Sequence, residues 1–172
     1  MKKLLLITLL ILIPNLNVLA AGGSSGGSGG SGGDGIEKKS MYKSAVNYVK
    51  SGKKLEKKGK VEKAKKKYEK AFNRLLKANK EDPSNPDVLN YLGFTSRKLG
   101  DFDNAEIYYL KGLAIKPDHN GINEYLGELY LSTNRPEKAK ERLLVLQNCN
   151  CEEYEELKAV SYTHLTLPTK NE

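Results

Sequence analysis

Apolar side chains recur at three- and four-residue spacing along the second half of the chain, a pattern typical of amphipathic helices. Two successive sets show it: Val88, Leu89, Leu92 and Leu99, then Ala105, Tyr108, Tyr109 and Leu113. Gly100 and Asp101 separate the two sets, and Pro117 follows the second. Because glycine and proline interrupt helices, the pattern predicts two helices joined by a short turn.

The predicted pair of helices occurs twice in register. Tyr91-Leu92-Gly93 recurs as Tyr125-Leu126-Gly127, and Ala105 recurs as Ala139, both 34 residues later. Asn134-Arg135-Pro136 takes the place of the first turn, with its proline at a position that a helix start tolerates. Small residues let neighbouring helix axes approach closely. A period of this length therefore predicts stacked helical hairpins.

A degenerate copy of the unit lies upstream, in the lysine-rich part of the chain. Its residues all precede their counterparts by 41 positions: Gly52, Gly59, Ala64 and Tyr68 precede Gly93, Gly100, Ala105 and Tyr109. The seven additional residues equal about two helical turns. They fit best in residues 75–82, so we expect a longer second helix in this first hairpin.

With these residues the chain resembles the tetratricopeptide repeat (TPR) family. Residues 86–119 supply the family's pattern through Tyr91-Leu92-Gly93, Gly100, Ala105, Tyr109, Gly112 and Pro117. Residues 120–153 depart from it at the end, where Leu143 replaces an aromatic residue and Cys151 stands in place of the closing proline. The resemblance implies an all-α, TPR-like solenoid of about three helical hairpins, closed by a C-terminal capping helix that is cut short.

The ends of the chain have compositions of their own. Residues 1–20 read as a signal peptide, with Lys2 and Lys3, a short apolar stretch, Pro14 and small residues before a cleavage site. The apolar stretch is too short to span a bilayer, so we expect no transmembrane span after cleavage and export to the periplasm. Residues 160–169 (VSYTHLTLPT) resemble a translated sequencing adapter, and we exclude this tail from the prediction of fold and function.

The predicted organisation has seven segments. They are a signal peptide (1–20), a flexible Gly/Ser linker (21–35), a lysine-rich first hairpin (36–85), two repeats (86–119 and 120–153), the start of a capping helix (151–159) and the adapter-like tail (160–172).

Composition argues against most enzymes. The chain has no Trp, only two His and two Cys, and no convergent set of titratable residues, so we predict no catalytic residue, no metal site and no cofactor. The net charge of +8 is uneven, since residues 36–80 carry 17 Lys/Arg against four Glu. We interpret this segment as a solvated helical surface. The alternative is weak contact with anionic membrane headgroups or acidic protein, whereas nucleic acid is not expected outside the cytoplasm.

Cys149 and Cys151 are the one pair of residues in the sequence with reactive side chains close together. In an oxidising compartment they are a candidate disulfide at the junction of the last repeat and the cap. The alternatives are free thiols, or a thiol-dependent metal-binding or redox site, although two thiolates alone leave a metal shell incomplete.

The resemblance also implies a function. In this family the first helices of the hairpins line a concave groove that binds an extended peptide or a helix of a partner protein. The groove positions carried over to this chain are Asn90, Phe94, Arg97, Lys98, Glu124, Glu128 and Leu131, with Val49, Lys53 and Glu56 as weaker candidates. This set predicts a groove that is cationic at one end and acidic at the other, with Phe94 as an apolar anchor. We therefore expect a non-catalytic protein-interaction scaffold whose partner protein the sequence does not identify.

Overall fold

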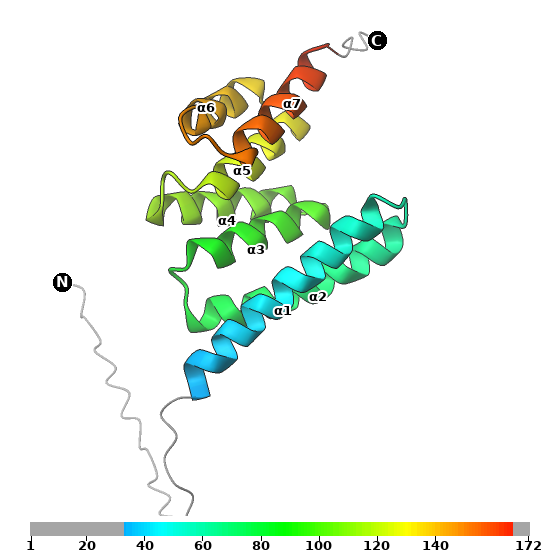
Figure 1. The fold of residues 1–172 in the computed structure, drawn as a ribbon, viewed down its shortest axis with the longest axis vertical. Coiled ribbons are helices and arrows are strands. Elements are labelled where there is room, and N and C mark those ends of the chain that lie inside the picture. The colour runs from blue at the N-terminus through cyan, green and yellow to red at the C-terminus, as the bar shows by residue number, and fades with distance from the viewer. Residues whose placement is uncertain (1–32, 167–172) are drawn as a thin grey trace, which may run out of the picture. The chain divides into compact units, whose positions relative to one another are not determined.

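The computed structural model describes residues 33–166, and these residues form seven α-helices and no strand (Figure 1). The helices are α1 (Gly33–Glu56), α2 (Val61–Glu81), α3 (Pro86–Lys98), α4 (Phe102–Ile115), α5 (Asn120–Ser132), α6 (Pro136–Leu146) and α7 (Glu152–Thr166). The predicted signal peptide, most of the predicted linker and the last six residues of the predicted tail lie outside the described residues. No helix within 33–166 is long and apolar enough to cross a membrane.

The helices pack as three hairpins and a cap. α1 pairs with α2, α3 with α4, and α5 with α6, while α2 contacts α3 and α4 contacts α5 to join the hairpins. α7 packs against both α5 and α6 (Figure 1). The described chain is thus the predicted all-α solenoid of helical hairpins.

Three equivalent turn residues have a left-handed backbone. Gly59, Gly100 and Asn134 end the first helix of each hairpin with φ values of 68°, 89° and 57°. Glycine adopts this conformation without a steric penalty, and asparagine tolerates it better than most other residues. The same backbone geometry therefore closes each helix, although the third turn has lost its glycine.

Helix lengths confirm one prediction and correct two boundaries. α2 has 21 residues against 14 for α4, so the seven additional residues do lengthen the second helix of the first hairpin. α1 already begins at Gly33, three residues inside the segment predicted to be a flexible linker. α7 continues to Thr166, beyond the predicted end of the cap at residue 159. Composition marked neither boundary, because α1 takes Gly33 and Gly35 of the glycine-rich segment into its first turn. α7 continues through residues 160–166, which contain no glycine or proline.

Close approach of the helices depends on glycine facing an aromatic ring. The Tyr109 ring of α4 is completely buried and occupies the space where a Cβ on Gly93 would lie. Tyr68 and Gly52 have the same relation in the first hairpin. In the third hairpin the large residue comes from the cap, because Leu157 of α7 lies against Gly127. The cap thus completes the core of the last repeat, to which Val160 also contributes.

Two equivalent residues cap the first helices of the second and third hairpins. The Asn85 side-chain oxygen accepts hydrogen bonds from the backbone N–H groups of Asp87 (3.1 Å) and Val88 (3.2 Å) at the start of α3. At the start of α5, His119 Nδ1 accepts from the Ile122 N–H at 3.2 Å. Side-chain acceptors at these positions satisfy backbone donors that have no partner inside the helix.

The Asn85 cap gives a first testable prediction. Asn85→Ala removes the acceptor of two backbone N–H groups and should lower the free energy of unfolding by about 1 kcal/mol. Lys60 is a matched control, because it occupies the corresponding position before α2 and makes no capping hydrogen bond. Urea denaturation should therefore show a clear loss for Asn85→Ala and little change for Lys60→Ala. Equal losses in the two variants would contradict this role for Asn85.

Candidate functional site

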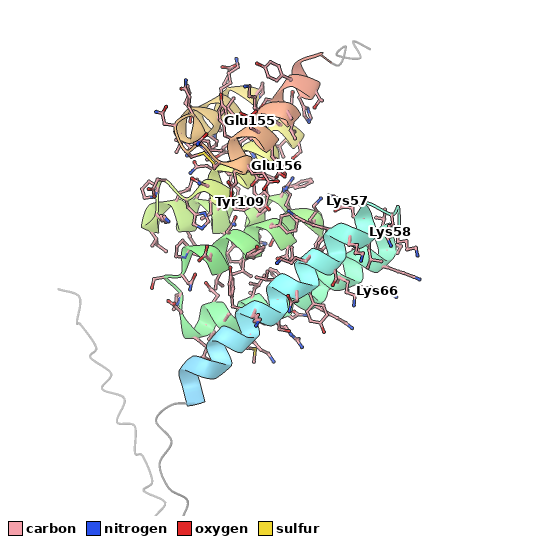
Figure 2. All side chains as sticks on the ribbon, viewed as in Figure 1. Lys57, Lys58, Lys66, Tyr109, Glu155 and Glu156 are labelled. Atoms are coloured by element: carbon pink, nitrogen blue, oxygen red, sulfur yellow. A yellow bond between two sulfur atoms is a disulfide. The ribbon has the colours of Figure 1, made fainter. Side chains whose placement is uncertain are left out.

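The first helices of the three hairpins and the cap surround a cavity of about 220 Å³. We call it the charged cavity, because four of its residues are Lys or Arg and four are Glu. Its lining is Lys53 and Glu56 of α1, Lys57 directly after α1, Phe94, Arg97 and Lys98 of α3, Glu124, Tyr125 and Glu128 of α5, and Glu156 of α7. Figure 2 shows Lys57 at the C-terminal end of α1 and Glu156 on α7.

The structure brings five of the seven predicted groove residues to this cavity: Phe94, Arg97, Lys98, Glu124 and Glu128. The weaker candidates Lys53 and Glu56 also line it, whereas Val49 is buried in the core. Lys57, Tyr125 and Glu156 were not predicted. Glu156 carried no signal of its own in the sequence, because its place in the cavity depends on how α7 packs.

Phe94, predicted as the apolar anchor of the groove, lines the charged cavity but is buried. The side chain is only 1% exposed and packs against Tyr68 and Tyr125, with ring centroids 5.7 Å and 5.0 Å away. Lys53 Nζ lies 5.0 Å from the centre of the Phe94 ring and covers it further. Neighbouring repeats bury this ring between them, which a reading of one repeat at a time cannot reveal.

Asn90 and Leu131 also fail as groove residues. Both are 6% exposed and neither lines the charged cavity. Asn90 lies against the start of α5, where its side-chain nitrogen would be 2.8 Å from a Cβ on Gly121. Leu131 belongs to the core shared by the third hairpin and the cap. In both cases the next element along the solenoid covers the predicted surface.

Two of the four cations in the cavity are already paired within the protein. The Arg97 guanidinium donates to the Glu128 carboxylate, and both side chains are largely buried. Lys98 Nζ donates to Glu56 Oε1 at 3.0 Å, and the Tyr68 hydroxyl donates to Glu56 Oε2 at 2.8 Å. Burial alone would raise the pKa of Glu56, but these two hydrogen bonds, together with the charges of Lys98 and Arg97, outweigh it and lower that pKa.

Lys53 is held by aromatic groups. Its Nζ donates to the Tyr125 hydroxyl at 2.9 Å and lies 5.1 Å from the centre of the same ring. An ammonium over an aromatic face is stabilised by the negative electrostatic potential of the ring. The cationic side of the cavity is therefore built around Tyr125 and Phe94.

Glu124 is the most unusual residue in the cavity. It is 3% exposed, and its Oε1 accepts no hydrogen bond from any described residue. Burial, followed by a side-chain hydrogen bond with Glu156 and the nearby Glu128 and Glu156 carboxylates, raises the pKa of Glu124 to about 9, against an opposing effect of Lys53. The Glu124 carboxyl therefore holds its proton at neutral pH.

This raised pKa predicts a pH-dependent stability. The ordinary pKa of glutamate is 4.5, so between pH 4.5 and about 9 folding takes up a proton at Glu124. The free energy of unfolding should then fall as pH rises, by at most about 1.4 kcal/mol per pH unit for one proton. Glu124→Gln removes the titrating group, so its stability should fall less than that of the wild type from pH 6 to pH 7 in urea titrations. Glu137→Gln, at an exposed position, should follow the wild type. Parallel curves for Glu124→Gln and wild type would disprove the raised pKa.

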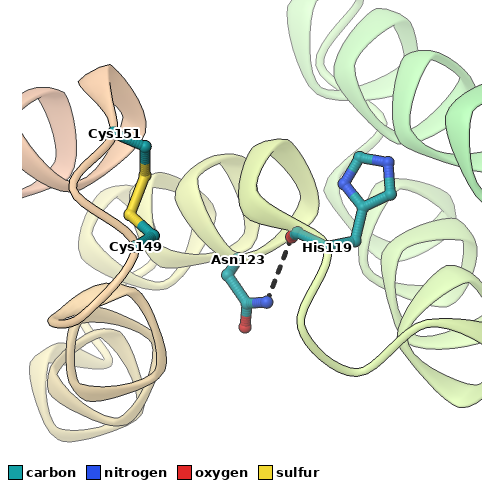
Figure 3. The surroundings of a disulfide bond; sticks show 4 residues. All are labelled: His119, Asn123, Cys149 and Cys151. Atoms are coloured by element: carbon teal, nitrogen blue, oxygen red, sulfur yellow. Dashed lines mark hydrogen bonds between the residues drawn. A yellow bond between two sulfur atoms is a disulfide. The ribbon is translucent and has the colours of Figure 1, made fainter.

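Cys149 and Cys151 form a disulfide in the turn between α6 and α7, with their Cα atoms 5.2 Å apart (Figure 3). Nearby at the start of α5, Asn123 Nδ2 donates to the His119 carbonyl oxygen at 3.1 Å. The disulfide lies at the junction where the sequence placed a candidate bridge. In this oxidised form the two sulfur atoms are not thiolate ligands for a metal.

A second hollow of about 340 Å³ lies between α6 and α7. It is lined by Lys140, Leu143, Leu144, Gln147 and Tyr154. None of the predicted groove residues is among them. Its lining carries a single charged side chain, so the charged cavity is the better candidate for a site with electrostatic selectivity.

Comparison with known proteins agrees with this architecture. Residues 86–119 match the family model of the tetratricopeptide repeat, whereas no curated protein matches the chain. The type III secretion translocator chaperone SycD of Yersinia enterocolitica is 21% identical with a TM-score of 0.58, over 77% of this chain and 91% of that chain. A thermophilic TPR protein of Thermus thermophilus is 26% identical with a TM-score of 0.57, over 72% and 61%. The first TPR domain of human RPAP3 is 24% identical with a TM-score of 0.52, over 71% and 92%.

The matched repeat and these structural similarities define the class of protein. The helical hairpins, their turns and their glycine–tyrosine contacts are those expected of tandem helical repeats. Residues 86–119 are a tetratricopeptide repeat, and the described residues have the helical-hairpin fold of tetratricopeptide repeat proteins.

Proposed function

We propose that this protein is a non-catalytic interaction module that binds a segment of a partner protein in the charged cavity. The observation that carries the proposal is the position of the cavity, which α1, α3, α5 and α7 line together. A ligand seated there would contact all three hairpins and the cap at once. Contacts from several rigid elements favour a defined binding geometry over non-specific adhesion.

Proteins of similar fold support peptide binding. SycD has been crystallised in complex with a peptide of the translocator YopD. The first TPR of Spaghetti (RPAP3) has been solved bound to the HSP90 peptide SRMEEVD. By analogy, we assign an extended or helical peptide segment as the ligand class of this chain.

The internal ion pairs narrow the choice of ligand. Arg97 and Lys98 already pair with Glu128 and Glu56, so a ligand gains little by displacing these contacts. Lys53 of α1 and Lys57, directly after α1, make no ion pair among the described residues. The cationic side of the cavity thus suits an acidic or polar part of a partner segment, and the opposite side requires a different chemistry.

A selection from a random peptide library against the mature chain tests the proposal directly. Wild-type protein should enrich a defined peptide motif, and Lys57→Glu should weaken binding of the enriched peptides about tenfold or more. Lys140→Glu on α6 is the matched control and should bind like the wild type, because it lies outside the charged cavity. Selection of no motif by the wild-type protein would refute peptide binding.

We also propose that the mature protein acts in the periplasm, on the strength of the signal-like sequence at residues 1–20. Cell fractionation of the native host should release the protein with the periplasmic contents. A variant lacking residues 1–20 should stay in the cytoplasm. Retention of the full-length chain in the cytoplasm would exclude export.

The lysine-rich first hairpin supports a second candidate function, weak docking on an anionic surface. Lys57, Lys58 and Lys66 project from the α1–α2 hairpin in Figure 2, and Lys58 and Lys66 belong to its exposed surface. Attraction of this kind is screened by salt within about 10 Å at 0.1 M ionic strength. Binding to vesicles that contain phosphatidylserine should therefore fall steeply with added salt. Salt-independent binding, or none, would exclude this function.

A further inference from the structure

The four carboxylates of the charged cavity differ in how they are compensated. Glu56 pairs with Lys98, and Glu128 pairs with Arg97. Among the described residues no ion pair joins Glu124 or Glu156 to a cation. The cavity therefore has one acidic end, formed by the adjoining carboxyl groups of Glu124 of α5 and Glu156 of α7, whose two side chains form no ion pair with a described residue.

Glu124 also has one buried acceptor atom without a hydrogen-bond partner among the described residues. Its side chain lines the cavity, is 97% buried and has an Oε1 that accepts no hydrogen bond within residues 33–166. An acceptor left without a partner in the interior costs about 1–3 kcal/mol, so such atoms are rare in folded proteins. A donor supplied from outside the chain would recover this free energy.

We infer that the acidic end of the charged cavity binds a cationic side chain of the partner segment, a lysine ammonium or an arginine guanidinium, between Glu124 and Glu156. This inference rests on the proposed function and specifies the chemistry of its ligand. A cation gains attraction from the Glu156 carboxylate, and from the Glu124 carboxylate once Glu124 releases its proton, whereas a neutral donor gains one hydrogen bond. Hydrogen bonds to charged groups are about twice as strong as neutral ones.

The other groups around Glu124 leave this acidic end to the ligand. Lys53 of α1 is engaged with the Tyr125 hydroxyl, and the guanidinium of Arg97 on α3 is engaged with Glu128. Tyr91 of α3 and Tyr109 of α4 also lie close enough to interact electrostatically with Glu124, but they carry no charge at neutral pH. Glu128 on the same helix adds negative potential.

An aromatic wall favours a long side chain. Tyr125 lines the cavity next to Glu124, and its ring already lies under Lys53 on the cationic side. The methylene groups of an entering lysine or arginine can pack along such a ring while the charged end reaches the carboxylates. The cavity of about 220 Å³ exceeds the roughly 30 Å³ that one water occupies in the liquid several times over.

Binding of a cation should be linked to release of a proton. The Glu124 carboxyl is protonated in the free protein at neutral pH, and the bound ammonium or guanidinium stabilises the carboxylate, so the proton passes to the solvent. Affinity for a basic peptide should therefore increase with pH, approaching tenfold per pH unit if one full proton is released. Glu124→Gln removes this linkage.

The test uses peptides enriched by the mature wild-type protein. Each enriched lysine or arginine is replaced by norleucine or citrulline, which keep the length of the side chain and remove the charge. We expect the replacement to weaken binding to wild type about tenfold, and to change binding to Glu124→Gln by less than about twofold. Between pH 6 and pH 8 the wild-type affinity for the basic peptide should rise, while the Glu124→Gln affinity stays flat. Glu137→Gln, an exposed glutamate on α6, should behave as wild type in both arms.

The outcomes separate this inference from the proposed function. Enriched peptides without a preferred basic residue, or an unchanged basic preference in Glu124→Gln, would overturn the cation site and leave peptide binding intact. If the peptides prefer a basic residue but the wild-type affinity for them does not depend on pH, the linkage to Glu124 is overturned. If wild type enriches no peptide at all, both the proposed function and the cation site fail.

Discussion

Arg97→Ala is expected to lower the free energy of unfolding by about 3–5 kcal/mol, because it leaves the Glu128 carboxylate without its cation in a largely buried site. The exposed fractions of the two side chains are 13% and 20%. Glu124 and Glu156 line the same cavity, so the loss of Arg97 leaves the Glu128 carboxylate near two further carboxyl groups. Urea denaturation at neutral pH measures the effect.

A double-mutant cycle tests the physical cause of that loss. Glu128→Ala in the Arg97→Ala background should recover part of the stability, because it removes the uncompensated carboxylate. Lys140 and Glu137 form a control pair on α6 whose side chains are 55% and 79% exposed. Lys140→Ala should cost less than about 1 kcal/mol, as exposed ion pairs do. A similar loss for Arg97→Ala and Lys140→Ala would show that the cavity pair is not buried in solution.

Gly93→Ala is expected to destabilise the protein by about 1–3 kcal/mol, the usual cost of overpacking a core. In an exposed helix the same substitution would stabilise by about 1 kcal/mol, because alanine is the better helix former. At Gly93 the new Cβ would overlap three ring atoms of Tyr109, and that ring is completely buried and cannot turn away. Thermal or urea unfolding of the single variant shows directly whether the substitution lowers or raises the stability of the protein.

Two further variants make this prediction specific. In a Tyr109→Leu background, Gly93→Ala should cost at least about 1 kcal/mol less, since the ring atoms that it would overlap are gone. Gly112→Ala is the control, because its Cβ would overlap only the Cδ1 end of the flexible Ile122 side chain. If Gly93→Ala lowers the free energy of unfolding equally in both backgrounds, the helices do not pack closely at this glycine.

Much of the architecture could be predicted because its causes are local. The 34-residue period, the turn residues and the small residues at fixed positions act within one hairpin or between adjacent ones. The lengthening of α2 was predictable for the same reason, since seven residues inserted without a helix breaker add two turns. The α1 and α7 boundaries were missed, because composition alone does not mark the residue at which a helix ends.

The candidate site was predictable only in its charges. Arg97, Lys98, Glu124 and Glu128 were assigned to a groove with a cationic and an acidic end, and all four line the charged cavity. The sequence did not indicate that Phe94 is buried beneath Tyr125 and Lys53. It gave no reason to expect Glu156 beside Glu124 either, because these residues come from different helices whose contact depends on the packing of the cap.

The amino-acid sequence by itself determined the helices, their pairing into hairpins and the signs of charge along their first helices, since periodicity and residue type act over one or two turns. Tertiary structure alone decided which of those side chains are accessible and which carboxylates lack a cation. Burial and compensation of charge depend on neighbours that are distant in sequence, such as Lys53 on Tyr125 and Glu156 beside Glu124. A pattern read along one repeat carries no information about such neighbours.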